Sequence, residues 1–159
     1  TAAYRGDIFN FKNTGDFGAL FYQQAEVGAA VKTSAPTGPF ALRPEHVADP
    51  LVVLARDYCL PALRSFLEWL RTQGMAFDLT LYHELLDGQP GLYADELEAW
   101  QDHQFRVHRL DRPLEPQDLS GHLNSRFFAQ AEGSDARRYR DLLLKLPIPV
   151  ERTHIERWS

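Results

Sequence analysis

The segment RDYCLP at residues 56–61 lies between a continuous apolar run and a helical pattern, a position where proteins place ligand-binding side chains. A diphosphate is held at such a turn by backbone N–H groups at a helix N-terminus, and glycine permits their close approach. This turn instead carries Arg56, Asp57 and Tyr58, which add negative charge and bulk. Two interpretations stay open: a nucleotide-binding turn, and a turn that only connects a strand to a helix.

Neighbouring side chains give further candidates, each with a plain structural alternative. Arg56 could reach an anionic ligand or lie in solvent. Cys59 stands beside Leu60 with no His and acid pair that can be placed around it, which is typical of a small core residue rather than a nucleophile. His83 and Glu84 end a strand where α/β proteins bind ligands, and the alternative is a polar strand end in water.

No metal centre is expected. The histidines never occur at the i, i+4 helical spacing or beside a cysteine, as a metal site would require. They are His46, His83, His103, His108, His122 and His154.

Composition sets aside several classes of partner. The chain has 159 residues, a net charge of −5 and no basic cluster longer than Arg137-Arg138, so neither nucleic acid nor anionic lipid is an expected partner. No apolar run approaches the roughly 20 residues that span a bilayer. The single cysteine excludes an internal disulfide and fits a reducing compartment, so we expect a cytoplasmic protein or the cytosolic portion of a larger one.

From Pro50 onward the pattern alternates between strand and helix, which predicts a three-layer α/β domain with a parallel sheet and crossover helices. The apolar run at 51–55 indicates a strand covered on both faces. Pro61 fits the first turn of the helix that follows, which Gly74 ends. The remaining expected strands are 77–82, 105–110, 126–131 and an extended tail at 150–159, and the remaining helices are 92–100 and 136–146.

Residues 1–44 show a different pattern. The stretches DIFNF at 7–11 and AAVKTS at 29–34, separated by glycines, predict short antiparallel strands that are too few to close a barrel. The first residue is Thr1 and the only methionine is Met75, so we expect this chain to be a piece of a longer protein. The predicted organisation is therefore an incomplete β-barrel at 1–44 and an α/β domain at 45–159.

Several motifs resemble those of the ferredoxin–NADP reductase-like flavoprotein reductases, over roughly residues 26–159. VGAAVKTSAPTGPFAL resembles the strand pair that closes the flavin barrel of that family, and LYADELEAW is similar to its L-Y-x-x-E-L helix. VVLARDYCLP resembles V-x-x-A-G-G-T-G-I-A-P with the glycine core replaced. LTLYHELL lacks the glycine and arginine of Y-G-x-R, and FFAQAEG lacks the cysteine and proline of C-G-P. Scaffold positions match, whereas ligand positions differ.

The resemblance implies a set of cofactor-binding residues. The turn from Arg56 to Pro61, with Asp57, Tyr58 and Cys59, would face the nucleotide. Arg112 matches the arginine that meets the adenosine 2′-phosphate in the family, while Asp111 replaces its serine partner. An aspartate there favours ribose hydroxyls over a 2′-phosphate, so NADH is expected rather than NADPH. Trp158 resembles the terminal aromatic residue that stacks near the flavin.

The resemblance further implies the nucleotide-side lobe of an electron-transfer oxidoreductase, with weakened or lost NAD(P)H binding. FAD would belong to the parent protein, no cofactor would be tightly bound to this chain alone, and the partner would be a flavin lobe or a redox protein. No catalytic residue can be named. One alternative is a catalytically inactive pseudo-reductase that acts as a scaffold. Another is an unrelated small-molecule binder that uses the crevice at the strand ends.

Overall fold

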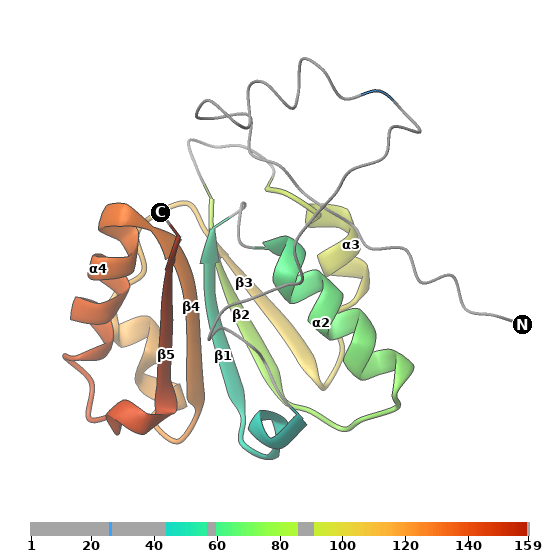
Figure 1. Ribbon diagram of the computed structural model, residues 1–159, viewed down its shortest axis with the longest axis horizontal. Helices are drawn as coiled ribbons and strands as arrows, with labels where there is room; N and C mark the ends of the chain where they lie inside the picture. The colour runs from blue at the N-terminus through green and yellow to red at the C-terminus, as the bar shows by residue number, and fades with distance from the viewer. Residues whose placement is uncertain (1–25, 27–43, 57–59, 86–90, 159) are drawn as a thin grey trace, which may run out of the picture. The chain divides into compact units, whose positions relative to one another are not determined.

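The computed structural model describes residues 26, 44–56, 60–85 and 91–158, but not the side chains of 44, 62, 132 and 156–158. Within these residues the chain builds one five-stranded sheet of order β3-β2-β1-β4-β5, in which all neighbours are parallel (Figure 1). The strands are β1 Leu51–Arg56, β2 Leu79–Glu84, β3 Phe105–Leu110, β4 Arg126–Glu132 and β5 Thr153–Trp158. The predicted α/β class is confirmed. The antiparallel strands expected at 7–11 and 29–34 lie outside the described residues.

Side chains of β1 alternate between two hydrophobic cores. Leu51, Val53 and Ala55 pack on the side of α2 Leu60–Thr72 and α3 Ala94–Ala99. Val52 and Leu54 pack on the other side, where α4 Gly133–Leu143 lies. Figure 1 shows α2 and α3 on one face of the sheet and α4 on the opposite face, so the architecture has three layers. A strand with two buried faces must be apolar throughout, as the sequence of β1 is.

α2 buries a stripe at helical spacing and ends at a glycine. Its buried side chains Leu60, Leu63, Leu67 and Leu70 face the first core. Gly74 has φ +64°, its N–H donates to Arg71 O at 3.0 Å, and Met75 N donates to Leu70 O at 3.1 Å. These two bonds form a Schellman motif, which requires a left-handed residue at that position and explains the glycine.

Three helical turns complete the described chain: η1 Pro44–Ala48, η3 Pro116–His122 and η4 Val150–Arg152. η1 lies before β1, and η3 lies between β3 and β4. β2 begins two residues later than expected, α3 is shorter than 92–100 because Tyr93 is left-handed with φ 57°, and α4 starts directly after β4. Among the described residues, no helix combines the length and apolar character that crossing a bilayer requires.

The chain order of the strands determines where a site can form. From β1 the chain moves outward to β2 and β3, and then returns to β4 on the other side of β1. The direction of the connections therefore reverses between β1 and β4. In open parallel sheets, ligands bind in the crevice outside the carboxyl ends of the strands at this reversal.

Candidate functional site at the carboxyl edge of the sheet

Glu84 is the last residue of β2 and its side chain is buried at the carboxyl edge of the sheet. The residue is 2% exposed, although a carboxylate is stable in that setting only when it is paired and hydrogen-bonded. Leu114 N, in the segment between β3 and η3, donates to its Oε1 at 2.6 Å. The expectation of a polar strand end in water is therefore wrong for Glu84, and His83 before it is also buried.

α4 supplies the other partners of this carboxylate. Arg138 donates through Nη1 to Glu84 Oε1 at 2.9 Å and through Nη2 to Oε2, which makes a two-pronged ion pair. Tyr139 donates its hydroxyl to Oε2 at 3.0 Å. The parallel fork of a guanidinium matches the two oxygens of a carboxylate, so this pair also fixes the orientation of α4 on the sheet.

Arg56, the last residue of β1, extends the network to the beginning of α4. Arg56 and Glu84 are register partners in the β1–β2 ladder, which places Arg56 Nε 3.6 Å from Glu84 Oε2. Arg56 Nη1 also lies 2.8 Å from Asp135 Oδ2, and Asp135 Oδ1 lies 3.5 Å from Arg138 Nε. We call Arg56, Glu84, Asp135, Arg138 and Tyr139 the edge network. It contains two cations and two anions.

Burial and hydrogen bonding shift the pKa of Glu84 in opposite directions. Burial raises that pKa, but the hydrogen bonds from Arg138 and Leu114 N lower it more, so the pKa lies below its usual value. Glu84 is therefore ionised at neutral pH. The pKa of Tyr139 is raised, chiefly by burial and then by the charge of Glu84, so its hydroxyl remains a donor. The network has the properties of a fixed group of paired charges rather than of an acid or base for catalysis.

A cavity of about 440 Å³ lies beside the edge network, between η3 and α4. Glu115 and Pro116 line it from η3 and its N-cap, and Ser134, Arg137 and Arg138 line it from α4. Arg137 and Lys145 bring positive charge that, within the described part of the chain, is not committed to any ion pair, while Glu115 and Asp141 bring two carboxylates. This cavity can accommodate a ligand with polar groups.

Arg112 is exposed, but its guanidinium is paired with a carboxylate. Its Nη1 and Nη2 donate to the two carboxylate oxygens of Asp118 at 2.8 and 2.7 Å. This pair lowers the pKa of Asp118 and raises that of Arg112. Asp111 is exposed next to it. A phosphate that bound Arg112 would have to compete with the carboxylate of Asp118.

The other predicted site residues are distributed as follows. Pro61 is the second residue of α2, half-buried, and Trp158 is the last residue of β5, paired in the ladder with Glu132. Asp57, Tyr58 and Cys59 lie outside the described residues. The structure thus brings Arg56 into the edge network and keeps Arg112 in a separate ion pair. Within the described ranges, no group of three or more His, Cys, Asp or Glu residues is arranged to hold a metal ion.

Sequence reasoning missed Asp135, Arg138 and Tyr139 as parts of the site. They lie more than 50 residues after Glu84, and nothing in their local pattern marks them as its partners. The sequence did contain one usable signal: Arg56 and Glu84 carry opposite charges and each ends an apolar strand, and the structure pairs these two strands in register. A buried ion pair needs further hydrogen-bond partners, and the other residues of the edge network supply them.

No family model and no curated protein matches this chain. Solved structures do. The FAD/NAD binding domain of a flavohem-like nitric oxide dioxygenase from Vibrio cholerae O1 biovar El Tor matches with a TM-score of 0.69 and 16% identity, over 92% of this chain and 65% of that one. The ferredoxin-NADP+ reductase of Plasmodium falciparum matches with a TM-score of 0.62 and 15% identity, over 77% of this chain and 57% of that one.

A mutant of the Plasmodium reductase, solved in complex with 2′P-AMP, matches with a TM-score of 0.59 and 16% identity, over 77% of this chain and 59% of that one. At these identities the likeness shows the fold. The resemblance to ferredoxin–NADP reductases is confirmed at that level, and the described sheet is of the kind found in these reductases. This chain spans between 57% and 65% of the lengths of these three structures.

Proposed function

We propose that this chain is the nucleotide-side lobe of a ferredoxin reductase-like electron-transfer oxidoreductase, with weakened NAD(P)H binding. The observation that carries the proposal is the all-parallel sheet of order β3-β2-β1-β4-β5, which places a reversal of direction and a polar cavity at its carboxyl edge. The similarity in fold to solved reductases supports the proposal. The flavin lobe or redox partner would be supplied by other parts of a larger cytoplasmic protein or by a separate protein.

The described residues at this edge do not fit a diphosphate well. Glu84 and Asp135 place two carboxylates beside Arg56 and Arg138, so both guanidinium charges are already neutralised within the protein. A diphosphate would have to displace Asp135 from Arg56 and would be repelled by both carboxylates. NADH is preferred to NADPH in this proposal, because Asp111 and Asp118 stand next to Arg112, where a 2′-phosphate would be bound.

Titration with NADH and NADPH tests the proposal. The variant Asp135→Asn tests whether the ion pair with Arg56 weakens nucleotide binding. We expect saturable but weak binding to the unaltered chain, with NADH favoured, measured by calorimetry or by amide shifts in NMR. Asp135→Asn removes the negative charge that holds Arg56 and should tighten NADH binding. Glu98→Gln, an exposed position on α3 paired with Arg109, is the matched control and should change nothing. No saturable signal at millimolar nucleotide, in either protein, would exclude the reductase proposal.

The edge network favours a second candidate, a pseudo-reductase that serves as a scaffold. The charged side chains of the edge network pair with one another, so α4 stays attached to the carboxyl edge of the sheet without a bound nucleotide. The colour of the parent protein separates the two candidates. Absorbance at flavin wavelengths, bleached by NADH, supports the reductase, whereas a colourless parent that does not bind nucleotide supports the scaffold.

A further inference from the structure

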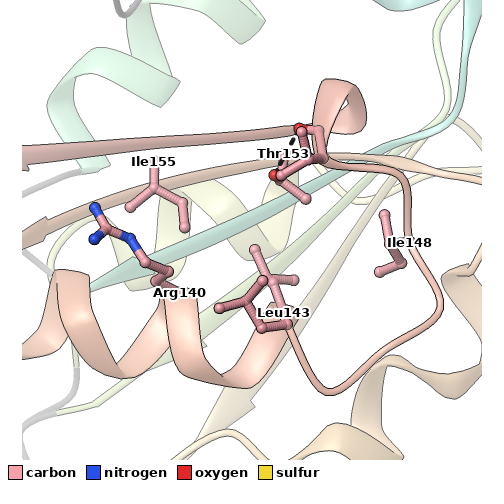
Figure 2. A pocket seen from close by; sticks show the side chains of 7 residues that line it. Arg140, Leu143, Ile148, Thr153 and Ile155 are labelled. Carbon is pink, nitrogen blue, oxygen red and sulfur yellow. Dashed lines mark hydrogen bonds between the residues drawn. The ribbon is translucent and has the colours of Figure 1, made fainter.

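A second cavity of about 240 Å³ lies between α4 and the beginning of β5, and it shares no lining residue with the cavity at the carboxyl edge. Figure 2 shows Leu143 rising from α4 toward Thr153 and Ile155, with Ile148 at one end and Arg140 at the other. The sheet ends at β5 within the described chain, so this cavity lies along the side of the domain. We call it the side pocket.

The walls of the side pocket are almost entirely aliphatic. Leu143 forms its buried floor, and Ile148 and Ile155 are partly buried against the same core. Leu144 and Val150 stand at the pocket with 68% and 67% of their surfaces exposed. These two exposed aliphatic side chains extend the apolar lining of the pocket to the surface of the protein.

Two polar side chains line the side pocket, those of Thr153 and Arg140. The hydroxyl of Thr153 donates to Val150 O at 2.8 Å, so it is satisfied within the protein. Arg140 makes no side-chain hydrogen bond or ion pair with any residue in the described ranges. Its guanidinium is permanently charged and offers a fork of N–H donors to a carboxylate. The pocket therefore combines an aliphatic cavity with a cation, at one end, that has no partner among the described residues.

The geometry points to a binding site for a small amphipathic carboxylate, an acid with an unbranched aliphatic chain. The chain would lie against Leu143, Ile148 and Ile155, and the carboxylate would pair with Arg140. The volume holds roughly eight groups of the size of a water molecule, at about 30 Å³ each, which fits a medium-length chain and excludes a drug-sized ligand. This inference goes beyond the proposed function and does not depend on it, because neither Arg140 nor the aliphatic lining belongs to the edge network.

Octanoate is the probe, with acetate and 1-octanol as its matched comparisons. We expect octanoate to bind saturably in calorimetry, acetate to show no binding, and 1-octanol to bind at least about tenfold more weakly, since it lacks the charge that Arg140 pairs with. In NMR the octanoate-induced amide shifts should fall between residues 140 and 155. Shifts that centre on residues 114–116 and 134–138 instead would place the ligand in the other cavity and overturn the inference.

Three variants complete the test, all at exposed positions where folding is not at risk. Arg140→Gln removes the cation and should weaken octanoate about tenfold or more. Leu144→Asp places a negative charge at the pocket and should weaken it further. Arg137→Gln, an exposed arginine three residues before Arg140 that lines the other cavity, is the control and should bind octanoate normally. Equal affinity of octanoate for the unaltered chain and for Arg140→Gln would overturn the inference, as would absence of saturation at millimolar octanoate.

Discussion

Tyr139 of α4 donates its hydroxyl to the carboxylate of Glu84 at the end of β2, over 3.0 Å and across 55 residues of sequence. Both residues are buried, and Arg138, the neighbour of Tyr139, holds the same carboxylate with two further hydrogen bonds. One helix therefore meets the sheet through two consecutive side chains. The strength of that attachment can be measured by removing one group at a time.

Glu84→Gln should reduce the free energy of unfolding by about 3–5 kcal/mol, since it leaves the charge of Arg138 without its buried partner. Urea denaturation at pH 7 measures the effect. Glu98→Gln removes an exposed partner of Arg109 and should cost about 1 kcal/mol or less. Equal losses in the two variants would show that the edge network does not stabilise the fold.

Tyr139→Phe should be milder and should also move the pH dependence of stability. It removes one hydrogen bond to a charged group, at a cost of about 1.5–3 kcal/mol. Because the pKa of Glu84 is lower in the folded state, its contribution is present above the ordinary value of 4.5 and is lost as pH falls through the folded pKa. Loss of the Tyr139 donor raises that folded pKa, so acid unfolding of the variant should begin at higher pH. An unchanged acid transition would contradict this.

Two histidines should make the protein less stable in mild acid. The pKa of His122 is lowered by burial and by Arg106 and His108, and that of His154 by burial and by His46 and Arg126. The unfolded chain then binds more protons than the folded one just below the ordinary pKa of 6.5, so stability falls as pH drops from there through the folded values.

Replacing both histidines, as His122→Gln with His154→Gln, removes these two titrations and should flatten the dependence of unfolding free energy on pH between about 7 and 5. Urea denaturation at several pH values measures the slope. A slope as steep as that of the unaltered chain would show that other groups cause the acid sensitivity.

The loss of stability on replacing a glycine by alanine should depend on its φ angle and on the space available for a Cβ. Gly91 has φ +82°, and a Cβ there would lie 2.7 Å from His83 Cε1 and 2.9 Å from Leu85 Cδ2, so Gly91→Ala meets both strain and collision. Gly74→Ala meets strain alone, about 1–2 kcal/mol, because nothing lies within 4 Å. Gly121→Ala meets neither. Thermal unfolding should rank the losses in that order, and a Gly91→Ala variant as stable as Gly121→Ala would refute it.

The sequence predicted the sheet and the first core helix because these elements follow local rules. β1 was recognisable from its uninterrupted apolar run, and α2 from apolar spacing that ends at Gly74. β2 was placed two residues too early because Phe77 is buried without being paired, while the ladder with β1 begins at Leu79. Burial alone does not distinguish a paired residue from one that only packs.

The candidate site was less predictable, since it depends on contacts between distant parts of the chain. Arg56 was recognised as a candidate, but its direction toward Asp135 follows from how α4 docks, which local patterns do not encode. Arg112 was expected at a phosphate, and its pairing with Asp118 arises from the turn that η3 makes. Charged side chains reveal their partners only when the whole fold is known.

β1 lies between β2 and β4 and contributes side chains to both cores, so neither helical layer can separate without exposing it. Its amide protons should therefore be the last to exchange with deuterated water, at the rate of global unfolding, while those of the outer strands β3 and β5 exchange through smaller openings. Uniform exchange across all five strands would argue against this. We therefore expect the helical layers on the two faces of the sheet to unfold together.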